Sequence, residues 1–348
     1  MKRLTAFLLA VIVMMPLLLT SCWWQEDFEY ELTEDGTGYR IVEYVGPYTR
    51  VIEFPESYKN KPVKEIGGNH WYRADEILIP ATVERIADRL FTDGYLEFET
   101  VSVDPDNPNY CSIDGNLYTK DGKCLLRYGE KKREAAFTVP DTVTRIGHHA
   151  FRGNYWLGEL TLPESVTRID GYAFYSCDSL ERISIPDTIE RIGYGAFLRC
   201  DALVYNVSEN CYWLGNEENF GVVLMKVKED RQGLTEIVLG EEVRIISYGA
   251  FYGCDKLESV DLSDGLVSIG DSAFGKCAAL DGIVIPKSVK HIDRGAFFGC
   301  ASMKTAHFSD PEGWSAGGEE ISPLTLVSPA TAAAHLTELY TAREWIKK

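Results

Sequence analysis

Residues 160–182 read LTLPESVTRIDGYAFYSCDSLER, and a 23-residue unit of this kind recurs along the chain. Full units also start at Phe137, Ile183, Ile237, Val260 and Ile283, a degenerate one starts at Ile77, and a partial one spans residues 51–67. A fixed period of about 20 to 30 residues predicts a stacked solenoid, in which each unit contacts only its neighbours. Such proteins usually act by presenting a surface, so the repeat favours binding over catalysis.

One unit shows how the repeat is expected to fold. Leu160 and Leu162 alternate with Thr161, which predicts a short strand with one buried face. Pro163 ends that strand because proline has no N–H to donate to a ladder. Phe174 is expected to enter the core on a single helical turn. No unit buries its interior alone, so stability depends on stacking and on caps at the two ends.

The start of the chain is typical of an export signal. Lys2 and Arg3 precede an apolar run over residues 4–19, which is too short for a stable membrane span. Residues 19–22 (Leu-Thr-Ser-Cys) resemble the lipobox of bacterial lipoproteins. The resemblance implies cleavage after residue 21, lipid attachment to the thiol of Cys22 and anchoring in a membrane. An ordinary signal peptide with a chance cysteine is the alternative.

Charge and motifs exclude several classes of function. Without Lys2 and Arg3 the chain has 33 basic and 53 acidic side chains, a charge of about −20. This balance argues against nucleic acid and anionic lipid as main partners. The histidines are scattered and no catalytic motif occurs, so we expect no enzyme, no cofactor and no metal. Asp104, Asp106 and Asn107 faintly resemble calcium ligands, but the prolines between them favour a turn.

Five cysteines occupy one repeat position, three residues after the repeat phenylalanine. An earlier unit has Asn154 in the same position. A Cys/Asn exchange fits a small buried group that packs or bonds to loop backbone, so we expect free thiols rather than disulfides. Cys111, Cys124 and Cys211 lie in the interruptions and cannot be paired from sequence. The column consists of Cys177, Cys200, Cys254, Cys277 and Cys300.

Two rows of side chains are candidates for ligand binding. An arginine row contains Arg85, Arg145, Arg168 and Arg191, followed by His291. It could engage carboxylates or sulfated glycans; the favoured interpretation is a solvated salt-bridge network with the acidic column Asp141, Glu164 and Asp187. Tyrosines beside the Ala-Phe turn could form a recognition patch or shield adjacent turns. They are Tyr172, Tyr175, Tyr194 and Tyr248.

The repeat resembles the BspA-like leucine-rich repeat family, whose pattern is close to LxxIxIPxxVxxIGxxAFxxCxxL. The likeness covers roughly residues 30–348, and Ala-Phe recurs at 150/151, 173/174, 196/197, 250/251, 273/274 and 296/297. It implies a leucine-rich-repeat solenoid of short β-strands and single helical turns, with an N-terminal β-hairpin cap and a short C-terminal helix. Hairpin insertions are expected near residues 101–132 and 207–233, projecting while the core stacks behind them.

These expectations divide the chain into segments. Residues 1–21 form the signal peptide, 22–29 the acylated tether, 30–76 the cap and partial repeat, 77–303 the solenoid, and 304–348 the C-terminal cap. The family resemblance implies adhesion or recognition by an exported lipoprotein, exposed at the surface of the outer membrane, with host matrix proteins, glycans or other cells as partners. An envelope scaffold or glycan-binding lipoprotein that meets no host partner is the alternative.

Overall fold

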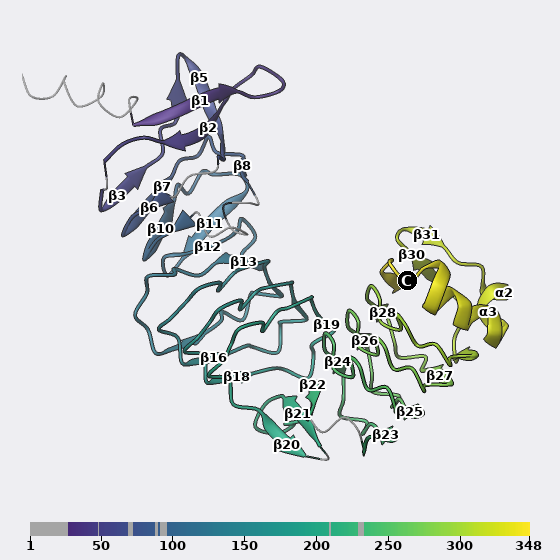
Figure 1. Ribbon diagram of the computed structural model, residues 1–348. Coiled ribbons are helices and arrows are strands. Elements are labelled where there is room, and N and C mark those ends of the chain that lie inside the picture. Colours follow the sequence, from purple (N-terminus) through teal and green to yellow (C-terminus); the bar gives the residue numbers. More distant parts are fainter. Residues whose placement is uncertain are drawn as a thin grey trace, which may run out of the picture. The chain divides into compact units, whose positions relative to one another are not determined.

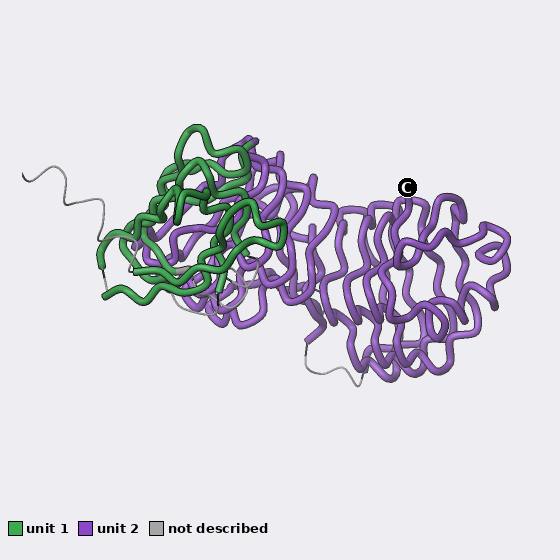
Figure 2. Tube along the Cα trace, turned by 90° about the horizontal axis from the view of Figure 1, so that it is seen from above, with its two compact units in different colours: residues 1–120 green, residues 121–348 purple. Residues whose placement is uncertain are grey.

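The computed structural model describes residues 27–47, 49–68, 72–87, 90, 96–208, 210–228 and 233–348 (Figure 1). The predicted signal peptide and the lipidation residue Cys22 lie outside the described residues, so both remain predictions. The chain divides into two compact units, residues 1–120 and 121–348 (Figure 2). None of the helices in the described part of the chain is long and apolar enough to cross a membrane.

Unit 1 begins with the predicted β-hairpin cap. Strands β1 (Phe28–Leu32) and β2 (Tyr39–Tyr44) pair antiparallel, and β2 continues in parallel onto β5 (Lys61–Ile66). Strand β4 (Ser57–Tyr58) adds to β5 through a tight turn. The rings of Tyr30 and Tyr58 stack 3.9 Å apart and tie the hairpin to this turn.

The partial repeat at residues 51–67 forms the first coil of unit 1. Its strand β3 (Val51–Glu53) stacks in parallel on β7 (Glu76–Ile79), which stacks on β10 (Thr100–Val103). Strand β5 likewise stacks on β8 (Arg85–Ile86), and β6 (Tyr72–Arg73) on β9 (Leu96–Glu97). Ile52, Ile77 and Val101 are buried in register, so each coil covers the next.

The calcium-like segment of unit 1 is a turn, as its prolines indicate. The backbone N–H of Asp106 donates to Asp104 Oδ1 at 2.8 Å. The side-chain amide of Asn107 is buried and donates to the carbonyls of Pro80 and Val83. These side chains therefore do not converge on a cation. The hairpin β11 (Tyr110–Ile113) and β12 (Asn116–Thr119) completes the unit.

Unit 2 is a β-solenoid with two parallel ladders per stack of coils. The first strand of each coil carries the repeat's leading apolar residues, and the second carries the arginine–isoleucine pair in the strands at residues 145–146, 168–169 and 191–192. The first ladder is β14 (Ala136–Thr138), β16 (Glu159–Thr161) and β18 (Arg182–Ser184). The second is β13 (Cys124–Arg127), β15 (Arg145–Ile146), β17 (Arg168–Ile169) and β19 (Arg191–Ile192).

The Ala-Phe segment forms tight turns rather than the expected single helical turn. Tyr172 and Ser176 adopt left-handed backbone, with φ of 56° and 57°. Backbone N–H groups alternate between bonds inside the turn and bonds to the next coil, as when Phe174 donates to the Ala196 carbonyl at 2.8 Å. A continuous helix would direct all of its N–H groups along its own axis. Because the N–H groups alternate here, the Ala-Phe turns of neighbouring coils also bond to one another, in addition to the two strand ladders.

Both insertions contribute strands to the stacking, whereas we expected hairpins that project from the solenoid while the core stacks behind them. Strand β13 from the first insertion pairs in parallel with β15, with Cys124 opposite Arg145. The second insertion forms β20 (Asn206–Ser208), β21 (Cys211–Leu214) and β22 (Val223–Val227) as an antiparallel meander. Its last strand then pairs in parallel with β24 (Ile245–Ile246). Each insertion thus supplies one strand to the ladder that the second strands of the coils form.

The second insertion separates two stacks of coils within unit 2. Phe151, Phe174 and Phe197 stack with 5.1 Å between successive ring centroids. Phe251 and Phe274 begin a second column at 4.9 Å. Among the described residues no ring contact joins Phe197 to Phe251, and β19 and β22 lie in different sheets. The second stack contains β23 (Glu236–Val238), β24, β25 (Ser259–Asp261), β26 (Ser268–Ile269), β27 (Gly282–Ile285) and β28 (His291–Ile292).

A C-terminal cap closes the second stack. Strand β32 (Trp345–Lys347) pairs antiparallel with β28, and β30 (Trp314–Ala316) pairs with β32. Trp314 and Trp345 are buried at this end. The predicted short helix is present, next to β29 (Thr305–Phe308), as α3 (Pro329–Ala334) between α2 (Pro323–Val327) and a π-helical turn, η2 (His335–Leu339). Strand β31 (Glu319–Glu320) forms the outer edge.

The cysteine column is buried, and its thiols bond to backbone. The Cys177 thiol donates to the Phe151 carbonyl at 3.1 Å, and Cys277 donates to the Phe251 carbonyl at 3.2 Å. Cys200 and Cys300 repeat this contact, each with the phenylalanine of the preceding coil. Asn154, in the same position, is also buried and accepts N–H bonds from residues 156 and 157. The predicted small, backbone-bonding group is confirmed.

Candidate binding surface: the arginine and tyrosine rows

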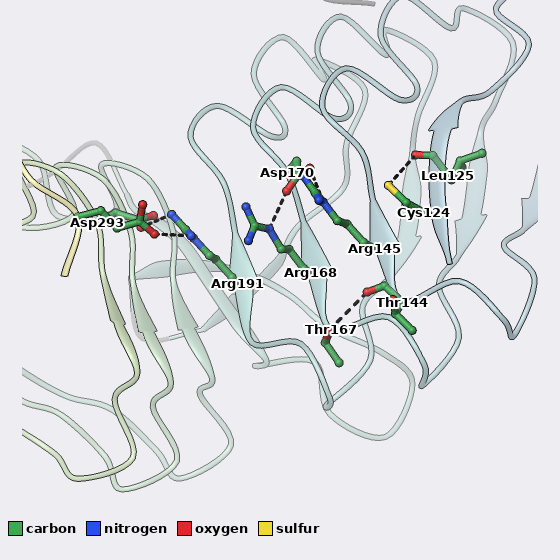
Figure 3. Close-up of polar contacts among 10 residues, drawn as sticks. Cys124, Leu125, Thr144, Arg145, Thr167, Arg168, Asp170, Arg191 and Asp293 are labelled. Carbon is green, nitrogen blue, oxygen red and sulfur yellow. Dashed lines mark hydrogen bonds and ion pairs between the residues drawn. The ribbon is translucent and has the colours of Figure 1, made fainter. Parts of the chain in front are cut away.

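Three of the predicted arginines form a row on one side of unit 2. Arg145, Arg168 and Arg191 are register partners on the neighbouring strands β15, β17 and β19. Figure 3 shows them side by side, with Asp170 between the first two and Asp293 beyond the third. Arg85 lies in unit 1, where it pairs with Glu65 at 2.9 Å.

Arg145 and Arg168 share a single carboxylate. Nε and Nη2 of Arg145 contact Asp170 Oδ2 at 2.7 and 2.6 Å, and Nε of Arg168 donates to Oδ1 at 2.7 Å. The Asp170 side chain is only 6% exposed, whereas the two arginines are 50% and 46% exposed. Two partly solvated guanidinium groups therefore flank one buried carboxylate.

Arg191 has a different environment because it contacts the second stack. Its Nη2 lies 2.8 Å from Asp293 Oδ1, and its Nη1 pairs with Glu344 of the C-terminal cap. The arginine is mostly buried, and burial raises the pKa of Asp293 to about 6 although Arg191 opposes the shift. Next to this cluster, Lys290 pairs with Glu190 at 2.6 Å.

The prediction that the acidic column pairs with the arginine row is wrong. The acidic column was expected to neutralise the arginines, but the carboxylates that do so are Asp170, Asp293 and Glu344. Asp187 instead accepts hydrogen bonds from Asn216 and Asn219 of the second insertion. Asp141 and Glu164 are exposed. The reason is the turn between the two strands of a coil, which keeps the acids on the polar turn and away from the arginine side chains.

The tyrosines form a continuous row that crosses from the first stack to the second. The Tyr172 ring lies 5.3 Å from Tyr194, which lies 4.5 Å from Tyr248. At the other end of the row, Tyr172 stacks on His149 at 5.1 Å and contacts Tyr175 at 5.8 Å. Tyr194 and Tyr248 are 39% and 38% exposed, so their rings are accessible as well as packed.

Hydrogen bonding and charge also connect the row. A side-chain hydrogen bond with Tyr194, together with burial, raises the pKa of Tyr248 to about 12. Burial and a hydrogen bond with Tyr194 raise the pKa of Tyr172. Tyr175 has a separate role at the edge, where the guanidinium groups of Arg152 and Arg199 lie 5.6 and 5.9 Å from its ring. The tyrosines of the row therefore pack on one another while Tyr194 and Tyr248 keep part of their surface exposed.

The repeat region matches a known protein family. The description "BspA type leucine rich repeat region" fits residues 130–216 and 229–313, in six copies. The chain belongs to the BspA-type leucine-rich repeat family. A leucine-rich-repeat solenoid is typically a non-catalytic binding scaffold. No curated protein matches the sequence.

Solved structures of bacterial leucine-rich-repeat proteins are similar to this BspA-type chain. A protein from Eubacterium ventriosum is 29% identical over 72% of this chain and 64% of its own length, with a TM-score of 0.43. A leucine-rich cell surface protein from Faecalibacterium prausnitzii is 20% identical over 87% and 96%, with a TM-score of 0.35. The pneumococcal vaccine antigen PcpA is 17% identical over 76% and 52%, with a TM-score of 0.30. This chain therefore spans less than two thirds of the first protein's length.

Sequence reasoning missed the acids that organise the BspA-type surface. Asp170 and Asp293 follow the second core isoleucine, a position that is Gly147, Gly193 or Gly270 in other coils. A carboxylate in a position otherwise occupied by glycine is a visible departure from the repeat. Glu344 could not be found in this way, because it lies in the cap and outside the periodic pattern.

Proposed function

We propose that this protein is an exported, lipid-anchored surface protein that binds an extracellular protein or glycan and performs no catalysis. The main support for a binding function is the row of Tyr172, Tyr194 and Tyr248. Their rings contact one another across two stacks of coils and remain partly exposed. Aromatic side chains with one accessible face are enriched in binding surfaces because they offer a large contact area at little conformational cost.

Adhesion is the role that this surface supports best. A solenoid displays many coils on one continuous face, so weak contacts along it can add up over a large ligand. The lipid on Cys22 would hold that face at a membrane, and the charge of about −20 that remains without Lys2 and Arg3 keeps the exported part soluble. Host matrix proteins, glycans and other cells are the proposed partners.

The binding surface is tested with a four-site variant. Tyr172, Tyr175, Tyr194 and Tyr248 are changed together to alanine, and circular dichroism verifies that the fold is retained. Binding of the mature protein to immobilised matrix proteins and to a glycan array is then compared with the parent. A matched control changes Tyr155, an exposed tyrosine outside the row, to alanine. Undiminished binding by a folded four-site variant would contradict the role given to the row.

Anchoring and exposure are tested on cells. Cys22→Ala should release the protein into the medium or leave its precursor uncleaved, and metabolic labelling with a fatty-acid analogue should mark only the parent. Protease treatment of intact cells should remove the parent protein. Survival of the protein until lysis would exclude adhesion and favour an envelope scaffold that faces the periplasm.

A further inference from the structure

Arg145 and Arg168 carry more positive charge than their surroundings neutralise. They share Asp170, whereas Arg191 alone contacts two carboxylates and Arg182 contacts Glu159 and Glu181. Within the described residues, Nη1 of Arg145 and both terminal nitrogens of Arg168 have no protein acceptor. Like charges directly opposite each other on neighbouring strands repel. One carboxylate balances only one of the two guanidinium charges, so a second anion at this point would reduce the remaining repulsion.

The geometry of the two guanidinium groups suits an external acid. Both side chains are about half exposed, and Asp170 holds Arg145 through Nε and Nη2 and Arg168 through Nε (Figure 3). Nη1 of Arg145 and the two terminal nitrogens of Arg168 remain for another anion. A fixed guanidinium presents two N–H groups in a plane that matches the oxygens of a carboxylate or sulfate. Because Asp170 has already oriented the side chains, an anion would bind with little further ordering cost.

The tyrosine row starts close to the cationic pair in the chain, because Tyr172 lies two residues after Asp170. Gly171 follows Asp170, and a β-carbon there would lie 3.5 Å from the His148 ring and 3.1 Å from the Tyr194 carbonyl. The Tyr172 ring lies 5.8 Å from His148 and 5.3 Å from Tyr194. The absence of a side chain at Gly171 thus lets the backbone after Asp170 pack closely against the His148 ring and the coil of Tyr194. Sugar rings pack their C–H faces on such aromatic rings and bond to tyrosine hydroxyls at the edge.

We propose that Arg145 and Arg168 bind the sulfate or carboxylate group of an acidic glycan whose sugar rings pack along Tyr172 and Tyr194. This inference rests on the proposed recognition function and names the chemical class of its ligand. An apolar protein patch would cover the arginine pair without supplying an anion, and a charge buried without a partner is costly. Here a half-exposed arginine pair and an exposed histidine lie next to the rings, so the surface fits a charged polysaccharide better than an apolar protein patch.

The experiment compares three acidic probes with neutral dextran. Heparin carries sulfates and carboxylates, hyaluronan carries only carboxylates, and polyglutamate is an acidic peptide. The mature full-length protein is immobilised, and affinities are measured at low and physiological salt. We expect heparin or hyaluronan to bind in a salt-dependent manner and dextran not to bind. The two glycans distinguish sulfate from carboxylate as the recognised group.

Variants test the arginine pair itself. Arg145→Gln with Arg168→Gln should lower the affinity for the acidic glycan at least tenfold, and Tyr172→Ala with Tyr194→Ala should lower it further. Arg182→Gln is the matched control, because it removes one exposed arginine of the same solenoid that already has its own acids. Circular dichroism and thermal melting verify that each variant is folded.

The outcomes separate the ligand class from the function. Glycan binding that the double arginine variant retains would overturn this inference. Binding of matrix proteins but of no acidic glycan, or polyglutamate binding as tightly as the glycans, would overturn it while leaving the recognition function intact. Failure of the protein to bind any matrix protein, glycan or cell would overturn both.

Discussion

Arg191 and Asp293 lie 102 residues apart in the sequence and are joined by a 2.8 Å ion pair in the interior of unit 2. Arg191 lies on β19, the last strand of the second ladder in the first stack. Asp293 follows β28, near the end of the second stack. Glu344 from the C-terminal cap contacts the same guanidinium. One side chain therefore connects two stacks and the cap, around the point where the second insertion interrupts the phenylalanine column.

Removing this arginine should destabilise unit 2 strongly. Arg191→Gln leaves two largely buried carboxylates without their shared cation, and breaking a buried pair in this way costs about 3 kcal/mol. Chemical denaturation followed by tryptophan fluorescence would report the loss, since Trp314 and Trp345 are buried in the adjacent cap. Arg182→Gln serves as the exposed control and should leave the transition almost unchanged. Equal stabilities of the two variants would refute the connecting role of Arg191.

Asp293 should give the protein a distinct pH dependence. Burial raises its pKa to about 6 in the folded state, above its ordinary value of 3.8. Between these two values the folded state binds more protons than the unfolded state, so the stability gained from protonated Asp293 is complete below pH 4 and is lost as the pH rises through 6. The unfolding free energy of the parent relative to Asp293→Asn should therefore fall across this window, by at most about 1.4 kcal/mol per pH unit. Above pH 7 the difference should be constant.

A matched acid tests the pH argument. Asp141→Asn alters an exposed carboxylate of the first stack and should reproduce the parent's profile between pH 4 and 7. If the unfolding free energies of the parent and of Asp293→Asn changed with pH in parallel, Asp293 would have its ordinary pKa in the folded protein.

The periodic part of the fold was predictable because each coil repeats the same local rules. Pro163 ends a strand, Leu160 and Ile169 are buried, and the Cys/Asn exchange marks one backbone-bonding position. These features depend on residues within one coil or on the coil next to it. The sequence of a single unit therefore contains nearly all of the information needed.

The ion pairs could not be predicted, because they depend on how coils are placed against one another. Arg145 finds its acid 25 residues away in the next coil, at a position that is normally glycine. The partner of Arg191 depends on the direction that the second insertion gives to the following stack, and the length of an insertion does not encode direction. The tyrosine row was visible as a pattern, but the contact of Tyr194 with Tyr248 crosses the same interruption.

The cysteine column should be chemically silent in the folded protein. Burial raises the pKa of the Cys300 thiol to about 12 and raises that of Cys177 and Cys277 as well, so little reactive thiolate is present at neutral pH. Iodoacetamide followed by mass spectrometry should leave these cysteines unmodified under native conditions and modify them in denaturant. Asp178→Cys, at an exposed position beside Cys177, should react at once and shows that the reagent reaches the surface. Rapid native labelling of Cys277 would contradict its buried placement.

Two phenylalanines of the first stack, one inside the column and one at its end, should differ in their contribution to stability. Phe174 is fully buried and stacks on a ring at each side, Phe151 and Phe197, so Phe174→Ala should cost about 4 kcal/mol. Phe197 ends the column, is 8% exposed and borders a cavity of about 330 Å³ that opens where the stack is interrupted. Its lost contacts are one-sided, and water can enter the space left behind, so Phe197→Ala should cost at least about 1 kcal/mol less. Urea denaturation of both variants measures the difference, and an equal or larger cost at Phe197 would show that the column continues through the second insertion.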